Sequence, residues 1–436
     1  MSGTAEPPAT GPAEFTSRAP RWGAVSGRRR FRAREHWPWR WWLGPPALYS
    51  SAIVRVLLMS PVSGHDIPGG DVAYTEALVA RPPEGVTYTT YVDALADGTL
   101  VERGRRPRHG AMEGTDALVF GARAVELGMR KTGLLYREPY RYLTVDPGAF
   151  DLVHAHVFPV RLIDTDLPLV TSSGFPLPVL YEDRFGWSRG HVVAATIAER
   201  ALSRVVGAEP SWFPPRRACR TMVQSAHYRD ELLAAGADRD RVVVRTLGIE
   251  GEATAPRTDR PTTVGFVSTM FEEKGGTVVL AAFQKLLAEH PEARLVVVGS
   301  GRRPHGVELP EASVTWMGRV SRQRVLDELL PTVDVLVHPT RCDSGPPYVI
   351  LEALQRGIPV VTSDLPWIDE GLTGPGVRRV PVDPSQVSEA LIDLFDPDTH
   401  AEASAAAVDL WRTRYSMAVV AELVGATYRE ALAAAP

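Results

Sequence analysis

Cysteine, long apolar runs and unbalanced charge are all scarce in this sequence. Its 436 residues include two cysteines, Cys219 and Cys342, which cannot build a disulfide framework and favour a reduced, intracellular setting. No apolar run approaches the ~20 residues that a membrane-spanning helix needs. The formal net charge is −4, and outside the first 50 residues no basic stripe indicates nucleic-acid binding. What remains is an ordinary soluble composition, 44% hydrophobic and 23% charged, and a length typical of two or three domains.

Residues 1–50 differ from the rest of the chain. They contain eight arginines, three glutamates and five of the ten tryptophans, without the apolar core of a secretory signal. This composition predicts a disordered Arg/Trp-rich extension. A second interpretation stays open, a peripheral contact with the inner face of a membrane, where arginine meets anionic lipid and tryptophan lies among the headgroups. In both interpretations the protein is expected in the cytoplasm.

Short apolar runs alternate with helical patterns through the rest of the chain. Most runs lack polar alternation, as in parallel sheets that are covered on both faces, and helical patterns such as 275–289 and 323–330 lie between them. Such repetition predicts an α/β protein with doubly wound domains. The predicted strands are 54–60, 86–92, 150–157, 167–173, 220–225 and 241–248 in a first series, and 262–268, 293–299, 313–318, 333–339, 358–363 and 377–382 in a second.

The chain is too long for one such domain, and the polar, turn-rich segment 248–261 has the composition of a linker. We therefore expect an N-terminal domain at 51–250 and a C-terminal domain at 258–410. The remaining residues, 411–436, hold an amphipathic helix after Ser416, a residue suited to an N-cap, and we consider for it a position packed back on the N-terminal domain. Ligands of doubly wound sheets lie at the carboxyl ends of the strands, so two facing domains would bind two substrates between them.

One carboxylate stands out in the second domain. Glu352 lies in the apolar stretch "YVILEAL", within a helix that is predicted to begin at Pro347 and to end before Gly357. The free N–H groups of Tyr348 and Val349 at such an N-terminus attract anions, and a carboxylate one turn further can accept hydrogen bonds from a diol. An anion and a diol together indicate a nucleotide, although a solvated glutamate is the commoner case on a helix.

Two further loops follow predicted strands of the same domain. The stretch "STMFEEKGG" at 268–276 places Lys274 where it can reach a phosphate. The stretch "GSG" at 299–301 lets a backbone approach a ligand closely. For these two features the alternatives are an exposed lysine and an ordinary turn.

Several other motifs fail the test of structural context. The pair Asp238 and Asp240 precedes a strand instead of following one, so we interpret it as a turn. Pro304 stands where a dinucleotide fingerprint needs its third glycine, and the chain has no Gly-x-Ser-x-Gly motif. His154 and His156 face one side of a strand, but without a nearby cluster of cysteines or carboxylates they are interpreted as polar cleft residues and not as metal ligands.

With these residues in place, the chain resembles the retaining glycosyltransferases of the large family 4 group (glycosyl transferases group 1), which have the GT-B fold of two Rossmann-like domains facing across a cleft. Their donor-site signature is matched by Glu352, by "GIPVV" at 357–361 and by Glu370, and "FVSTMFEEKGG" resembles their Gly-Arg-Leu-x-x-x-Lys-Gly loop. In the first domain, "SGHDIPGGDVAYTEAL" and "FDLVHAHV" resemble their glycine-rich acceptor loop and their Asp-x-x-His-x-His strand. The similarity covers about residues 54–430.

The resemblance implies transfer of a sugar from a nucleotide-sugar donor to an acceptor hydroxyl with retained configuration, without a metal or another cofactor. In such enzymes the residue matching Glu352 holds the ribose, and the lysine matching Lys274 neutralises the diphosphate. The implied partners are a nucleotide sugar and a carbohydrate, lipid-linked or small-molecule acceptor. The implied site residues are Lys274, Asp343 and Ser344 for catalysis, Thr269, Lys274, Gly299, Gly301, Arg319, Tyr348, Val349 and Glu352 for donor binding, and Gly69, Gly70, Asp71, His156 and Ser173 for acceptor binding.

Three positions depart from the family pattern. Ser344 stands for the first glutamate of the usual pair, Thr269 for the loop arginine, and Ser173 for a histidine at the end of the fourth strand. These departures keep two alternatives open. One is a non-catalytic GT-B protein that binds a nucleotide sugar or a partner. The other is a nucleotide-sugar epimerase on the same fold, for which no acid/base pair at the sugar carbon is identifiable.

Overall fold

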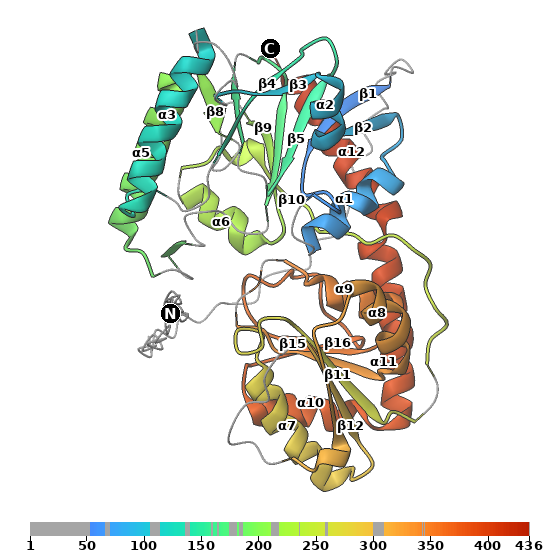
Figure 1. The fold of residues 1–436 in the computed structure, drawn as a ribbon. Coiled ribbons are helices and arrows are strands. Elements are labelled where there is room, and N and C mark those ends of the chain that lie inside the picture. The colour runs from blue at the N-terminus through green and yellow to red at the C-terminus, as the bar shows by residue number, and fades with distance from the viewer. Residues whose placement is uncertain are drawn as a thin grey trace, which may run out of the picture. The chain divides into compact units, whose positions relative to one another are not determined.

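The computed structural model (Figure 1) describes residues 53–435 except 66–69, 105–113, 136–139, 158–159, 164, 174–180, 183–185, 211–217, 235, 258–259, 300–308, 342 and 344. The expectations for residues 1–50, and the proposed roles of Gly69, Gly301 and Ser344, lie outside the described residues. Within them, no helix is long and apolar enough to cross a membrane.

Two six-stranded sheets carry the fold, and every pair of neighbouring strands in both is parallel. The first consists of β1 (Val54–Met59), β2 (Val86–Thr90), β5 (Leu152–His156), β7 (Leu169–Ser173), β9 (Ala218–Val223) and β10 (Val242–Val244). The second consists of β11 (Thr263–Val267), β12 (Arg294–Val298), β13 (Val314–Gly318), β14 (Val335–His338), β15 (Val360–Ser363) and β16 (Val377–Val380).

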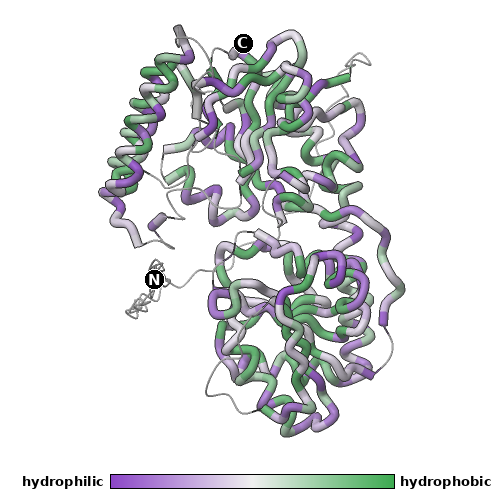
Figure 2. The backbone as a smooth tube through the Cα atoms, viewed as in Figure 1, coloured by the Kyte–Doolittle hydropathy of each residue, from purple (hydrophilic) through white to green (hydrophobic). Residues whose placement is uncertain are grey.

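The predicted series of strands is thereby confirmed, and its physical basis is burial. Residues Val56 to Met59 of β1, for example, are completely inaccessible to solvent, as expected for a strand covered on both faces. In Figure 2 green stretches, the colour of hydrophobic residues, recur in both large sheets between paler and purple residues.

The order of the strands creates a switch point in each sheet. The orders are β10-β9-β7-β5-β1-β2 and β13-β12-β11-β14-β15-β16. In the first sheet β2 lies on one side of β1 and the later strands lie on the other side. In the second sheet β12 and β13 lie on one side of β11 and the later strands on the other. The loops after β1 and β5, and after β11 and β14, therefore diverge at the carboxyl edge. Such divergence opens a crevice in which doubly wound sheets bind their ligands.

Helices pack on these sheets and connect the strands. The helices of the first domain are α1 (Gly70–Ala80), α2 (Tyr91–Asp97), α3 (Gly114–Lys131), α5 (Arg189–Val205) and α6 (Ala226–Ala234). Those that follow are α7 (Gly276–Glu289), α8 (Arg322–Arg324), α9 (Tyr348–Gln355), α10 (Pro384–Leu394), α11 (Pro397–Leu410) and α12 (Met417–Ala434).

Two predicted details were wrong. The strand expected over 86–92 ends at Thr90, whose hydroxyl accepts a hydrogen bond from Asp93 N and begins α2. The helix expected over 323–330 is a short α-helix that continues as a π-helix over Val325–Leu329. Ser416 is the N-cap residue of α12, as predicted, although its hydroxyl donates to the Arg412 carbonyl and makes no capping bond to a helix N–H.

A small third sheet was not predicted. It has the order β3-β4-β6-β8, with strands β3 (Leu100–Glu102), β4 (Arg141–Val145), β6 (Val160–Ile163) and β8 (Ala208–Pro210). Its outer pairs are antiparallel. Strands of three to five residues carry too few side chains to show a period of their own.

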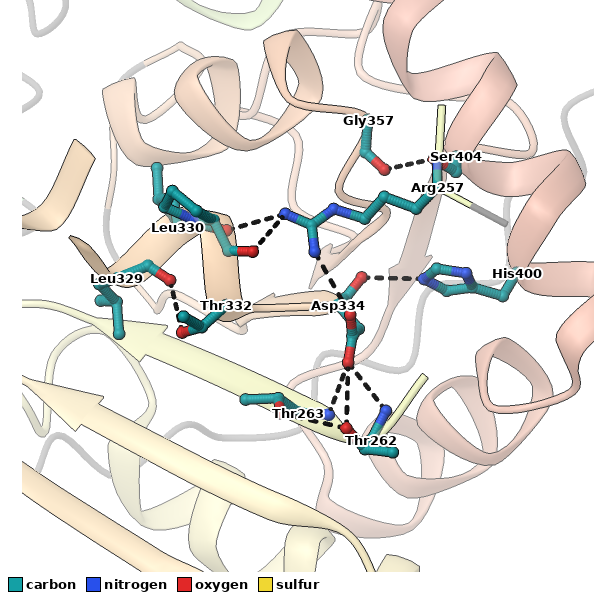
Figure 3. A network of polar contacts seen from close by, with 11 residues as sticks. Arg257, Thr262, Thr263, Leu329, Leu330, Thr332, Asp334, Gly357, His400 and Ser404 are labelled. Carbon is teal, nitrogen blue, oxygen red and sulfur yellow. Dashed lines mark hydrogen bonds and ion pairs between the residues drawn. The ribbon is translucent and has the colours of Figure 1, made fainter. Parts of the chain in front are cut away.

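The segment between the two large sheets is anchored at its end by polar contacts (Figure 3). Arg257 donates to the carbonyls of Leu330 and Pro331 at 3.0 and 3.2 Å and lies 3.3 Å from Asp334. Asp334 in turn accepts from the backbone N–H groups of Thr262 and Thr263 at 2.8 and 2.9 Å. These bonds fix where β11 begins, beside β14.

The last helix, α12, packs on the first sheet. It contacts β7, β9 and α1, and the Tyr428 hydroxyl lies 3.0 Å from that of Tyr88. The Ile249–Ser416 bridge holds the helix start beside the chain that leaves the first domain.

Candidate functional site

The switch point of the second sheet brings Lys274 and Asp343 together. Lys274 follows β11 and Asp343 follows β14, 69 residues later, and Lys274 Nζ lies 2.5 Å from Asp343 Oδ2. The approach of the two loops depends on Gly275, which has a φ of 79°. A Cβ at this position would lie 2.2 Å from the carbonyl oxygen of Pro339.

Burial and the neighbouring groups act in opposite directions on the pKa of Asp343. The side chains of Lys274 and Asp343 are 16% and 15% exposed, and His338 Nε2 lies 3.7 Å from Asp343 Oδ2. Burial acts to raise the pKa of Asp343, but the His338 ring and the charge of Lys274 lower it below its ordinary value. Burial also lowers the pKa of His338 despite the nearby carboxylate. Both shifts favour a carboxylate at Asp343 beside a neutral imidazole at His338.

Helix α9 begins beside this pair. Pro347 precedes it and Pro347 O accepts from the N–H groups of Ile350 and Leu351, so the N–H groups of Tyr348 and Val349 come before the first helical hydrogen bonds. Gly345, with a φ of 63°, leads into the helix, and a Cβ there would lie 2.1 Å from Gln224 Oε1 of the first domain. The helix N-terminus thus lies close to the segment between β9 and α6.

Glu352 is buried one turn further along α9, with 4% of its surface exposed. Its Oε1 lies 2.8 Å from Arg322 Nε and 2.6 Å from Arg322 Nη2. Burial raises the pKa of Glu352 above its ordinary value, although the charge of Arg322 opposes the shift. The prediction that this glutamate is more than a solvated helix residue is therefore confirmed in its burial, while its role stays a prediction.

A cavity of about 390 Å³ opens beside Glu352. Its walls come from α1, from residues 249–254 and from α9, and include Ala77, Arg322 and Arg356. Apolar alanine surface on one side and charged groups on the other would suit a flat, polar-edged ring.

The first sheet places the predicted acceptor residues at its own switch point. Gly70 and Asp71 begin α1 after β1, and His156 ends β5, with His156 Nε2 3.3 Å from Asp71 Oδ1. A Cβ at Gly70 would lie 2.3 Å from Tyr348 Cδ2. The glycine therefore permits contact between α1 and the start of α9.

A chain of hydrogen bonds extends inward from His156. Ser172 Oγ lies 2.7 Å from His156 Nδ1 and 2.8 Å from His154 Nε2, and His154 Nδ1 lies 2.7 Å from the Tyr428 hydroxyl. Burial and the neighbouring His156 lower the pKa of His154 to about 3, so one of its nitrogens donates and the other accepts. A carboxylate only accepts, so a hydrogen on His156 Nε2 suits Asp71, 3.3 Å away. With His156 Nδ1 as an acceptor, the chain has one direction: Tyr428 donates to His154, His154 to Ser172, and Ser172 to His156.

The other predicted residues lie around these two centres. Gly299 has a φ of 95°, and a Cβ there would lie 2.2 Å from the Ser268 carbonyl oxygen and 2.8 Å from Thr269 N. Arg319 is exposed after β13, and Ser173 is half-buried at the end of β7. The structure therefore gathers Thr269, Lys274, Gly299 and Asp343 at adjoining strand ends.

Four residues of the site were not predicted: Arg322, His338, Ser172 and Tyr428. His338 stands at the end of the run "VDVLVHPT", where a polar residue closing an apolar strand was a usable signal. Tyr428 is 274 residues away from His154, and no local pattern connects them.

Among the residues that the structure describes, no three His, Cys, Asp or Glu side chains are grouped so as to hold a metal ion. The expected independence from metal stays a prediction.

Comparison with known proteins shows a match to a family model over part of the chain. Residues 261–396 match the family model described as glycosyl transferases group 1. The GDP-mannose-dependent monoacylated alpha-(1-6)-phosphatidylinositol monomannoside mannosyltransferase of Corynebacterium glutamicum is 28% identical over 162 residues, 34% of this chain and 42% of that protein. The phosphatidyl-myo-inositol mannosyltransferase of Mycolicibacterium smegmatis is 26% identical over 246 residues, 55% of this chain and 56% of that protein. The chain thus spans about half the length of these curated relatives.

Solved structures give the fold. Sucrose-phosphate synthase from Thermosynechococcus elongatus superposes with a TM-score of 0.55 at 16% identity, over 87% of this chain and all of that one. Anabaena HepE in complex with UDP superposes with a TM-score of 0.53 at 15% identity, over 86% of this chain and 99% of that one. The predicted GT-B fold is confirmed by these likenesses.

Proposed function

We propose, on the premise that residues 261–396 belong to the glycosyl transferases group 1 family, that this protein is a glycosyltransferase. It moves a sugar from a nucleoside diphosphate to an acceptor hydroxyl and retains the configuration at the anomeric carbon. The observation that carries the proposal is the meeting of Lys274 and Asp343 at the switch point beside the N-terminus of α9, with buried Glu352 one turn along that helix.

The donor would bind across these groups. A diphosphate beside Lys274 and the N–H groups of Tyr348 and Val349 gains from one full charge and from the helix dipole. Lys274 is one of only three lysines in the chain, and a compact ammonium can turn from Asp343 to a phosphate. Asp343, once released, can accept hydrogen bonds from sugar hydroxyls. The ribose diol would reach Glu352 and the base would enter the adjoining cavity.

Transfer would then proceed by front-face substitution. As the bond between the anomeric carbon and the phosphate oxygen breaks, negative charge grows on the diphosphate, where Lys274 and α9 stabilise it. The acceptor oxygen bonds to the same face of the carbon, and its proton passes to the departing phosphate oxygen. No paired-carboxylate dyad of the hydrolase kind is needed. Asp71, held by His156, is placed to orient the acceptor hydroxyl.

The acceptor class is proposed from the relatives. Both curated relatives are named for mannosyl transfer to phosphatidylinositol lipids. We extend the class, and not the individual substrate, to this protein: a hydroxyl on the polar head of a glycolipid.

A protein that binds a nucleotide sugar without turnover is the competing function. It is favoured by the internal partners of the two key groups, Asp343 for Lys274 and Arg322 for Glu352. A diphosphate must compete with the first and a diol with the second.

The experiment is a mass-spectrometric screen of UDP-, GDP- and ADP-sugars for hydrolysis or transfer by the purified full-length protein, with Lys274→Ala as the matched inactive variant. Release of nucleoside diphosphate by the parent protein alone supports the enzyme. Binding by calorimetry without any release would identify the binder, and neither binding nor release would refute both.

A further inference from the structure

Helices α3 and α5 expose apolar side chains to solvent. Twelve large hydrophobic residues are exposed in the described part of the chain, and eight of them lie on α3, on the turn after it or on α5. Their exposed fractions run from 44% for Phe120 to 63% for Val205. The eight are Leu118, Phe120, Val125, Leu127, Leu134, Val193, Ile197 and Val205, and we call them the α3/α5 apolar face.

The opposite sides of the same helices bury charge. Glu126 of α3 and Glu199 of α5 are each 4% exposed, and Arg161 of β6 is completely buried between them. Arg161 Nη1 lies 3.1 Å from Glu126 Oε1, and Arg130 Nη2 lies 3.1 Å from Glu199 Oε1. The inner sides of the two helices therefore hold both carboxylates together with apolar side chains such as Val119 and Val192, which are 0% and 3% exposed. Their outer sides are apolar as well, which departs from the polar outer face of a helix that packs on a core and faces water.

The exposed apolar side chains lie on two helices that pack side by side. The end of α3 meets the start of α5, since His191 Nε2 lies 2.7 Å from the Gly133 carbonyl oxygen. Arg130 and Glu199 pair further along, so the two helices are antiparallel neighbours, as Figure 1 also shows. Exposed apolar side chains that gather in one region in this number indicate an interaction site, because those of a typical monomer are scattered singly.

The exposed charges of the two helices are mainly basic. Glu126 and Glu199 are buried, and two further acidic groups are paired, Asp116 with Arg103 at 3.4 Å and Glu102 with Arg123 at 3.5 Å. The other exposed or half-exposed basic side chains of α3 and α5 are Lys131, Arg189, Arg200 and Arg204, and we call these four the basic rim. A second copy of the chain would bring this basic rim against itself. An anionic surface would complement it.

We propose that the α3/α5 apolar face rests on the surface of an anionic phospholipid bilayer. The outward leucine, isoleucine, valine and phenylalanine side chains enter the boundary between headgroups and acyl chains, and the basic rim meets lipid phosphates. This is the arrangement of interfacial amphipathic helices. The inference does not rest on the proposed sugar transfer, because it uses only the exposed and buried side chains of this helix pair.

The test uses the full-length protein and two kinds of vesicle, pure phosphatidylcholine and an equimolar mixture with phosphatidylglycerol. The test variant is Phe120→Ser/Ile197→Ser. The matched control is Ile53→Ser, because Ile53 and Ile197 are 60% and 62% exposed. Cosedimentation measures binding, and thermal melting verifies that each variant is folded.

We expect the parent protein and Ile53→Ser to bind the anionic vesicles equally and more tightly than phosphatidylcholine. The double variant should bind at least about tenfold more weakly, because two interfacial apolar side chains are lost. Arg204→Glu, which reverses one rim charge, should weaken binding to the anionic vesicles alone, and added salt should do the same.

Equal vesicle binding by parent and double variant would overturn the proposal, as would a parent protein that binds neither vesicle. A parent dimer in sedimentation velocity that the double variant dissociates, with unchanged vesicle binding, would instead assign the face to a second copy of the chain.

Discussion

Replacing Glu352 tests the proposed donor site at its most buried charge. Glu352→Ala removes the carboxylate that we expect to accept hydrogen bonds from the ribose diol, and Glu352→Gln keeps its shape without its charge. The fold should survive both changes. Arg322, the partner of Glu352, has a side chain that is 45% exposed, so water can solvate the guanidinium that loses its anion.

The magnitude follows from the kind of bond that is lost. A hydrogen bond to a charged group contributes about 1.5–3 kcal/mol, so Glu352→Ala should weaken nucleotide binding by ~10–100-fold. A neutral hydrogen bond contributes about 0.5–1.5 kcal/mol, so Glu352→Gln should lose roughly 1 kcal/mol, a factor of ~5.

The pH dependence has a definite sign. The carboxylate is the form that accepts from hydroxyl groups, and burial raises the pKa of Glu352. Protonation therefore begins at a higher pH than in an ordinary glutamate, and affinity should fall as the pH is lowered through this range. Arg322→Ala removes the charge that opposes the rise of the pKa, so the fall should then begin at a still higher pH.

The assay is isothermal titration calorimetry with UDP and GDP across a pH series. Glu328→Ala is the matched control, because Arg324 Nε lies 2.6 Å from Glu328 Oε2 and Glu328 has a side chain that is 60% exposed. Affinity of Glu352→Ala within twofold of the parent value would refute the assignment. A fall that moves to lower pH in Arg322→Ala would refute the electrostatic argument.

Three further outcomes are expected. Lys274→Ala should lower kcat by at least about 10²-fold with a smaller change in KM, because one preorganised charge at the leaving group is lost. Lys274→Arg should recover part of the rate. A normal kcat in Lys274→Ala would exclude a role for Lys274 in stabilising the leaving group. Arg161→Met should destabilise the first domain by about 3–5 kcal/mol, since the buried Glu126 and Glu199 lose one of their two cations and are left to share Arg130; an unchanged urea midpoint would contradict this. Tyr428→Phe removes the donor to His154 at a cost of about 1–3 kcal/mol, and should raise the KM for the acceptor and not for the donor; equal changes in both would oppose a positioning role.

Local sequence was sufficient for the strands of the two large sheets and for the candidate donor residues. A strand covered on both faces must be apolar along its length. Apolar runs in the sequence, such as that of β1, therefore identify these strands directly. Lys274 was found because it lies in a loop after a predicted strand, where ligands of such sheets bind. Glu352 was found because it is a charge in an apolar stretch, one turn into a helix whose N-terminus can bind an anion. Both signals depend on residues close together in the chain.

The tertiary structure alone decided which of these residues meet. The order of strands in a sheet is set by packing over the whole domain, so the 2.5 Å contact of Lys274 with Asp343 had no local signature, nor had the bond of Tyr428 to His154 or the small sheet of β3, β4, β6 and β8. Helices α3 and α5 show the limit most clearly. Amphipathic spacing predicts two unlike faces, but only the burial of Arg161 between Glu126 and Glu199 decides that these two carboxylates turn inward, because an ion pair formed across three elements offsets a desolvation cost that no single helix could.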